Sequence, residues 1–201
     1  MKKVILPIVL LAFVGFGVLE TGLTDMEREF AIKEMSKTQD HLLSTVAGLS
    51  EVQLSFKPDS TAWSISECVE HLAISENAFD QMLQGSLQAP ADPAKRNEVK
   101  MTDEQLLGII TDRSKKVKTR ESFEPTGKFG SHEETLKAFT AKRAEHIEYV
   151  KSTEDELRYH YGQLPFGTID AYQVLLFMSG HTERHIKQME EVKAHENFPS
   201  E

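Results

Sequence analysis

The chain has 201 residues, which is enough for one domain with a hydrophobic core and does not require two. Hydrophobic residues make up 39% of it and charged residues 27%, an ordinary composition for a globular protein. With 32 Asp and Glu against 23 Lys and Arg, the net charge is -9, which disfavours nucleic acid or an anionic membrane as the main partner.

Residues 1–24 differ from the rest and are expected to be a signal peptide or an N-terminal anchor. Lys2 and Lys3 precede an apolar run, residues 4–19, that is broken only by Pro7. The run is short for a membrane span, which needs about 20 apolar residues, and is closer to the core of a secretory signal peptide. We therefore expect an exported domain, periplasmic or extracellular. It would be tethered to the outer face of the membrane only if the leader stays uncleaved.

Cys68 is the only cysteine, so no intramolecular disulfide can form and stability must come from packing. A single thiol within a helix of an exported protein is usually buried. We expect Cys68 to be buried rather than to act as a metal ligand or nucleophile.

The rest of the chain is expected to form helices separated by loops, with no convincing alternating strand. The expected helices span residues 25–47, 64–87, 102–119, 131–151 and 168–192. Three of them begin with a capping-box pattern, at Ser64, Thr102 and Ser131. Four long helices and one short one predict an all-α fold, an antiparallel four-helix bundle with a long crossover connection that contains the extra short helix. The bundle would cover residues 25–194, followed by a polar tail over 195–201.

Two histidines in the last expected helix, His181 and His185, are four residues apart and so share one helical face. Apolar residues occupy the same face at spacings of three and four: Val174, Met178, Met189 and Val192. Both imidazoles are therefore expected to face the core. Because burying an unsatisfied polar ring is costly, a metal ion that binds both rings is an attractive explanation.

His71 in the expected helix 64–87 is the candidate third ligand, since sites in helical bundles are built from side chains on facing helices. Three histidines leave positions for water or substrate, as in catalytic sites, and they suit zinc, nickel, iron or copper. Spacing and phase leave open that the three are core histidines without a metal. The other five are expected on the surface or in loops: His41, His132, His146, His160 and His195.

Two protease motifs are excluded by single positions. A zincin needs Glu directly after the first His of H-E-x-x-H, where this chain has Thr182. The inverted order, H-x-x-E-H, needs Glu where this chain has Arg184. Neither a G-x-S-x-G elbow nor a phosphate-binding glycine-rich loop is present.

The order of these motifs resembles the DinB-like superfamily, also called the DinB/YfiT-like metalloenzymes. The resemblance rests on the stretch Trp63–Leu72, on Phe166 and Gly167, and on the stretch His181–Ile186. It covers residues 25–192 and excludes the leader. The resemblance implies a four-helix bundle in which His71, His181 and His185 hold one divalent metal ion, often nickel or zinc, with iron a further option.

Some members of that family are S-transferases or isomerases that use low-molecular-weight thiols, and several form homodimers. Those thiols are cytoplasmic, so an exported domain would lack the cosubstrate. The resemblance implies a metal-dependent enzyme with hydrolase- or thiol-transferase-like chemistry on an unknown small molecule, and an exported location disfavours the thiol-dependent reaction. The alternatives are a non-catalytic exported metal-binding or stress-associated bundle, and a structural bundle with vestigial histidines.

Two residues near His71, Trp63 and Glu67, have alternative interpretations. Trp63 either covers one side of the metal pocket or, as the simpler reading, packs the start of its helix. Glu67 either orients His71 by accepting its hydrogen bond or only caps the helix. Glu70 is expected to face solvent.

Overall fold

The computed structural model describes residues 22–114 and 116–200 and is mostly helical. The long helices are α1 (Asp25–Val46), α3 (Ile65–Ser86), α5 (His132–Ser152) and α6 (Ala171–Lys193). The shorter helical elements are α2 (Glu51–Ser55), η1 (Pro93–Glu98), α4 (Asp103–Thr111), η2 (Glu121–Phe123) and η3 (Leu157–Tyr159). Two strands, β1 (Tyr161–Leu164) and β2 (Gly167–Asp170), pair as an antiparallel hairpin.

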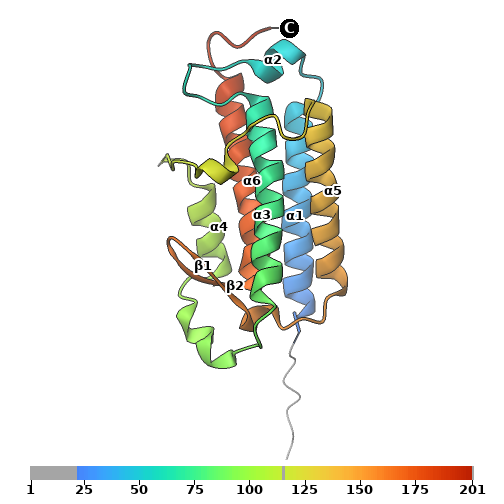
Figure 1. Cartoon of the computed structure of the whole chain (residues 1–201), viewed down its shortest axis with the longest axis vertical. Helices are drawn as coiled ribbons and strands as arrows, with labels where there is room; N and C mark the ends of the chain where they lie inside the picture. The colour runs from blue at the N-terminus through green and yellow to red at the C-terminus, as the bar shows by residue number, and fades with distance from the viewer. Residues whose placement is uncertain (1–21, 115, 201) are drawn as a thin grey trace, which may run out of the picture.

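The four long helices lie side by side as a bundle along the long axis of the molecule (Figure 1). In that view α1 and α6 run upward, whereas α3 and α5 run downward. α3 and α5 are parallel because the connection between them, residues 87–131, returns the chain to the end where α3 begins. The predicted four-helix bundle with a crossover that contains a short helix is confirmed. Its neighbours are not all antiparallel, however, since the packed pairs α1–α6 and α3–α5 are parallel.

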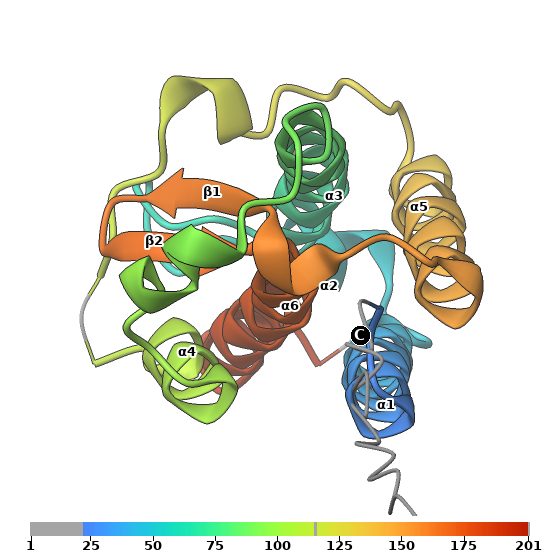
Figure 2. The same cartoon turned by 90° about the horizontal axis from the view of Figure 1, so that it is seen from below.

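α6 is the most enclosed helix, and every residue from Ala171 to Gly180 is buried. α1 and α3 cover it on the bundle side, and α4 packs against its other side (Figure 2). Gly180 permits this contact, since a Cβ there would lie 2.7 Å from Cγ2 of Ile110 on α4. α4 therefore belongs to the core of the domain although it lies outside the bundle.

Capping boxes define the starts of five described helices, because the N-cap hydroxyl and the side chain three residues later satisfy each other's backbone N–H groups. The N-cap residues are Thr24, Ser50, Ser64, Thr102 and Ser131. The three boxes predicted from the sequence are confirmed. α6 begins differently, with the carboxylate of Asp170 accepting from the backbone N–H of Gln173 at 2.7 Å.

The prediction for the third helix is wrong at its end, which lies at Thr111 and not at residue 119. Asp112 leaves the helical conformation with a ψ of 115°. Its carboxylate accepts hydrogen bonds from the backbone N–H and the hydroxyl of Ser114, at 2.8 and 2.9 Å. This local turn competes with helix continuation.

The last helix begins at Ala171, three residues later than predicted, because residues 167–170 form a strand. β2 pairs with β1 in a register that places Leu164 opposite Gly167. The expectation that the chain has no strand is therefore wrong. Two strands of four residues each are too short to show a clear alternating pattern.

A buried ionic cluster joins all four long helices. Arg143 of α5, with no exposed surface, donates to both carboxylate oxygens of Glu76 on α3. It also donates to the hydroxyls of Thr38 on α1 and Thr182 on α6, at 2.9 and 2.8 Å. His146 is buried as well, with Nδ1 3.0 Å from Glu76, so the prediction of a surface position for His146 is wrong. Burial alone raises the pKa of Glu76, but Arg143 and His146 outweigh it and the pKa lies below its ordinary value.

The predicted leader, residues 1–24, falls almost entirely outside the described residues, so the signal peptide or anchor and the exported location stay predictions. Across residues 22–114 and 116–200, no helix combines the length and the apolar character that crossing a membrane takes. At the other end of the chain, Phe198 in the predicted polar tail packs edge-on against Phe56, with ring centroids 5.6 Å apart.

Candidate metal centre

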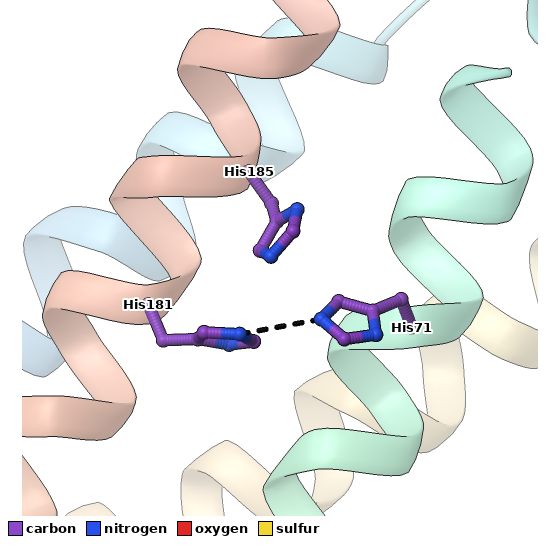
Figure 3. Close-up of side chains that lie close together, drawn as sticks. All are labelled: His71, His181 and His185. Carbon is purple, nitrogen blue, oxygen red and sulfur yellow. Dashed lines mark hydrogen bonds between the residues drawn. The ribbon is translucent and has the colours of Figure 1, made fainter. Parts of the chain in front are cut away.

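The structure brings His71 of α3 together with His181 and His185 of α6 (Figure 3). The ring centroid of His71 lies 5.0 Å from that of His181 and 4.4 Å from that of His185, and the last two are 4.6 Å apart. One ligand atom from each ring lies within 4.8 Å of the others. In the described part of the chain, this is the one group of three or more His, Cys, Asp or Glu side chains spaced to hold a metal ion.

Local helix geometry explains most of this arrangement. His181 and His185 are one turn apart on α6, so both rings lie on the side of the helix that faces α3. α3 starts at the Ser64 capping box, which places His71 about two turns into the helix. Because α3 and α6 pack against each other in opposite directions, His71 lies opposite the His181–His185 pair.

The three imidazoles are held in their neutral form. His71 and His185 are only 3% and 7% exposed, and His181 is partly exposed. Burial lowers the pKa of all three below the ordinary value, and it does so strongly for His181 and His185. Repulsion from a neighbouring protonated ring lowers the pKa of these two further, from His185 and His71 in the case of His181 and from His71 in the case of His185. A neutral imidazole is the form that binds a metal ion.

The hydrogen bonds of His71 orient one nitrogen toward its neighbours. Its Nδ1 lies 2.8 Å from the backbone oxygen of Phe123, and a carbonyl can only accept, so Nδ1 carries the hydrogen. Nε2 of His71 is left with its lone pair and lies 3.2 Å from Nε2 of His181. Two nitrogen ligands of a tetrahedral zinc ion, each at about 2.0–2.1 Å, would be separated by about 3.3 Å. The spacing and chemistry of the donors therefore fit a divalent metal ion.

His185 has an outer partner of its own, since its Nδ1 lies 3.0 Å from Oε1 of Gln188. Such partners commonly fix the orientation of metal-binding histidines. Sequence reasoning missed both of these partners. Gln188 could have been found, because it lies three residues after His185 on the same helix. The carbonyl of Phe123 could not, because it comes from a loop distant in sequence.

Trp63 lies against the histidines, with its ring 4.9 Å from that of His71 and 6.1 Å from that of His185. It also packs against the hydrophobic core around α3, so its two interpretations are compatible. The suggestion that Glu67 orients His71 is wrong. The carboxylate of Glu67 accepts from the backbone N–H of Ser64 at 2.7 Å and from Lys57 at 2.9 Å, toward the start of the helix and away from His71.

Aromatic rings surround the other side of the cluster. Phe79 meets the ring of His181 edge-on at 5.4 Å, and Phe177 stacks on it at 5.9 Å. Phe166, at the tip of the β1–β2 hairpin, stacks on Phe177 at 6.1 Å and is 40% exposed. The hairpin that the sequence did not predict therefore contributes to the apolar surroundings of the histidines.

Cys68 and Glu70 also lie near His71 on α3, and both are buried. Cys68 is free and fully buried, as predicted, and burial raises the pKa of its thiol, which makes it a poor nucleophile. Glu70 does not face solvent as expected. Its side chain accepts hydrogen bonds from the backbone N–H groups of residues 126–128.

Comparison with known proteins places this chain in a family. YfiT from Bacillus subtilis, described as a probable metal-dependent hydrolase with an unusual four-helix bundle topology, has a similar fold with a TM-score of 0.55. The match has 15% sequence identity and covers 86% of this chain and 89% of that one. The uncharacterized protein YuaE of Bacillus subtilis (strain 168) is 27% identical over 147 residues, which is 73% of this chain and 86% of YuaE. The family model of the DinB superfamily matches residues 34–189. The chain therefore belongs to the DinB superfamily.

Proposed function

We propose that the protein is a metal-dependent hydrolase in which His71, His181 and His185 hold one divalent metal ion. The observation that carries the proposal is the convergence of three neutral imidazoles, with one ligand atom of each within 4.8 Å of the others. Three histidine ligands leave a coordination position for water or substrate. The description of YfiT as a probable metal-dependent hydrolase supports the same class of enzyme.

A divalent ion in such a site supplies a Lewis acid for a carbonyl or phosphoryl oxygen and makes a coordinated water acidic near neutral pH. The chain's own residues orient and shield the site. The Nδ1 bonds of His71 and His185 hold their rings in place. The rings of Trp63, Phe79 and Phe177 give the site an apolar surface, which suits an uncharged substrate.

The carboxylates closest in sequence to the ligands are engaged elsewhere. Glu67 caps α3 and pairs with Lys57, and Glu70 binds the loop at residues 126–128. Glu183 lies 3.0 Å from Nδ1 of His41. The proposal therefore assigns none of the three as a general base.

Metal analysis of the purified protein, prepared without an affinity tag, tests the ligand assignment. We expect stoichiometric metal in the wild type and in the control variant His195→Ala, whose ring packs on Phe56 away from the cluster. We expect His185→Ala to lose the metal while it keeps its helical content. Full metal in His185→Ala would show that the assignment is wrong. The same analysis identifies the ion as nickel, zinc or iron.

The alternative is a non-catalytic metal-binding bundle. It is favoured by the burial of His71 and His185 and by the Trp63 ring that lies against both. Titration of the Co²⁺-substituted protein with azide separates the two functions. A change in the visible spectrum would show an open coordination position, as hydrolysis requires, whereas an unchanged spectrum would favour the alternative. The homodimer remains a prediction that sedimentation would test. The exported location remains a prediction that cell fractionation would test.

A further inference from the structure

Two hydrogen-bonded links join the histidine cluster to the chain between α4 and α5. One runs from His185 through Gln188 to Arg113, and the other runs from His71 to a loop that Glu70 holds. We propose that Gln188 and Glu70 are positioning residues, which set the tautomer and the orientation of His185 and His71 for metal binding. The inference rests on the proposed function, because it gives these residues roles that act through the three ligands.

In the first link, the Oε1 atom of Gln188 lies between His185 and Arg113. Nη1 of Arg113 donates to this oxygen at 3.2 Å, and Nδ1 of His185 lies 3.0 Å from it. Arg113 is itself held by Glu191, to which its Nε and Nη2 donate at 2.8 and 2.7 Å. A guanidinium group has donors only, so Gln188 must present its oxygen and not its NH₂ group on this side. Nδ1 of His185 must then carry the hydrogen, which leaves the lone pair on Nε2.

The second link begins at the carboxylate of Glu70, which is 8% exposed. It accepts hydrogen bonds from three successive backbone N–H groups, those of Thr126, Gly127 and Lys128, at 3.1, 3.0 and 2.7 Å. Successive amides that converge on an anion form a nest. Gly127 has a φ of 78°, a conformation that side-chain-bearing residues rarely adopt, so this nest depends on glycine.

The nest fastens the loop to α3 directly beside His71. Only Glu124 and Pro125 separate it from Phe123, and the ring of proline fixes one of the intervening backbone angles. The backbone oxygen of Phe123 is thereby held 2.8 Å from Nδ1 of His71. Glu70 thus acts on the ligand that follows it in sequence through the loop rather than by direct contact.

Together the two links determine which ring nitrogen carries the hydrogen in each of the three histidines. His71 and His185 each carry hydrogen on Nδ1 and keep the lone pair on Nε2. Because Nε2 of His71 has no hydrogen, the 3.2 Å contact between the Nε2 atoms of His71 and His181 requires the hydrogen on His181. Two of the three ligands are therefore ready to bind a metal ion, and only His181 has to change its tautomer.

Imidazole ¹⁵N spectra of the metal-free protein test the tautomers directly. We expect the Nδ1–H form for His71 and His185 and the Nε2–H form for His181 in the wild type. Gln188→Leu should shift His185 away from the Nδ1–H form, whereas Gln188→Glu, which keeps an acceptor between His185 and Arg113, should preserve it. A role in stability alone would not produce this pattern.

Competition with a chromophoric chelator for Zn²⁺ measures the consequence for binding. We expect Gln188→Leu and Glu70→Gln each to weaken Zn²⁺ binding about 10- to 100-fold, the usual effect of removing such outer partners. The matched control is Glu67→Gln, which loses a capping carboxylate one turn earlier on α3 and should bind Zn²⁺ as the wild type does.

The outcomes separate this inference from the proposed function. Wild-type tautomers and wild-type Zn²⁺ affinity in both Gln188→Leu and Glu70→Gln would overturn the positioning roles while leaving the metal site intact. A wild-type protein that binds no Zn²⁺ would overturn the metal site itself and the inference with it.

Discussion

Replacing Arg143 with methionine removes the cation at the centre of the four long helices while it keeps an unbranched side chain. Arg143 has no exposed surface, and Glu76, which it pairs with, is 2% exposed. The substitution leaves the Glu76 carboxylate buried with His146 as its remaining ionic partner. It also removes the donors to the hydroxyls of Thr38 on α1 and Thr182 on α6, so these two hydrogen bonds to α5 are lost.

The expected cost is about 3–5 kcal/mol of the free energy of unfolding, the range for breaking a buried ion pair by removing one partner. For a domain of this size that corresponds to about 6–20 °C in the melting temperature. The double variant Arg143→Met/Glu76→Leu should recover part of this loss, since well-packed apolar residues can replace a buried pair at little cost. The pKa of Glu76 should rise in the single variant, because burial then acts with less opposition.

Urea unfolding followed by circular dichroism measures these differences. Lys142→Met is the matched control, because Lys142 is the adjacent residue on α5 and its ion pairs with Asp80 and Glu145 lie at the surface. It should change the free energy of unfolding by less than about 1 kcal/mol. The reasoning is refuted if Arg143→Met costs no more than Lys142→Met, or if the double variant is less stable than the single one.

Three further predictions concern the metal centre and the helix caps. Zn²⁺ at 100 times its dissociation constant should stabilise the wild type by about 2.7 kcal/mol; calorimetry should show no such gain for His185→Ala, and an equal gain would contradict its role as a ligand. In the metal-free protein, burial lowers the pKa of the three histidines, so the unfolded chain takes up protons that the folded chain does not. The free energy of unfolding should therefore fall as the pH drops below about 6.5, by up to about 1.4 kcal/mol per pH unit for each histidine. His181→Phe should flatten this pH dependence in urea titrations between pH 5 and about 7. An unchanged slope would contradict the assignment of the pH dependence to the buried histidines. Ser131→Ala removes the N-cap of α5 and should cost about 1 kcal/mol, whereas Ser44→Ala, exposed on α1, should cost less than about 0.5 kcal/mol in the same unfolding assay.

The starts of α3, α4 and α5 were predictable because the capping boxes that fix them are local. Ser64 and Glu67 lie within one turn, and each satisfies the backbone of the other whatever the rest of the chain does. The β1–β2 hairpin was not predictable, since a four-residue strand carries little periodic signal. The end of α4 was not predictable either. The burial of polar residues in the core was not predictable either. His146 and Glu70 resemble surface residues in the sequence, and they are buried because their partners arrive from other segments.

The sequence by itself determined which face of the last helix carries His181 and His185, since residues four apart share a face in any α-helix. It also identified His71, because the capped helix that contains it is part of the resemblance to the DinB superfamily. Only the tertiary structure decided that α3 and α6 pack in opposite directions and bring the three rings together. It likewise decided that the backbone oxygen of Phe123 meets Nδ1 of His71 and that Arg113 donates to the Gln188 oxygen that lies against His185. These contacts depend on where the chain between α4 and α5 crosses the bundle, and no local pattern encodes that path.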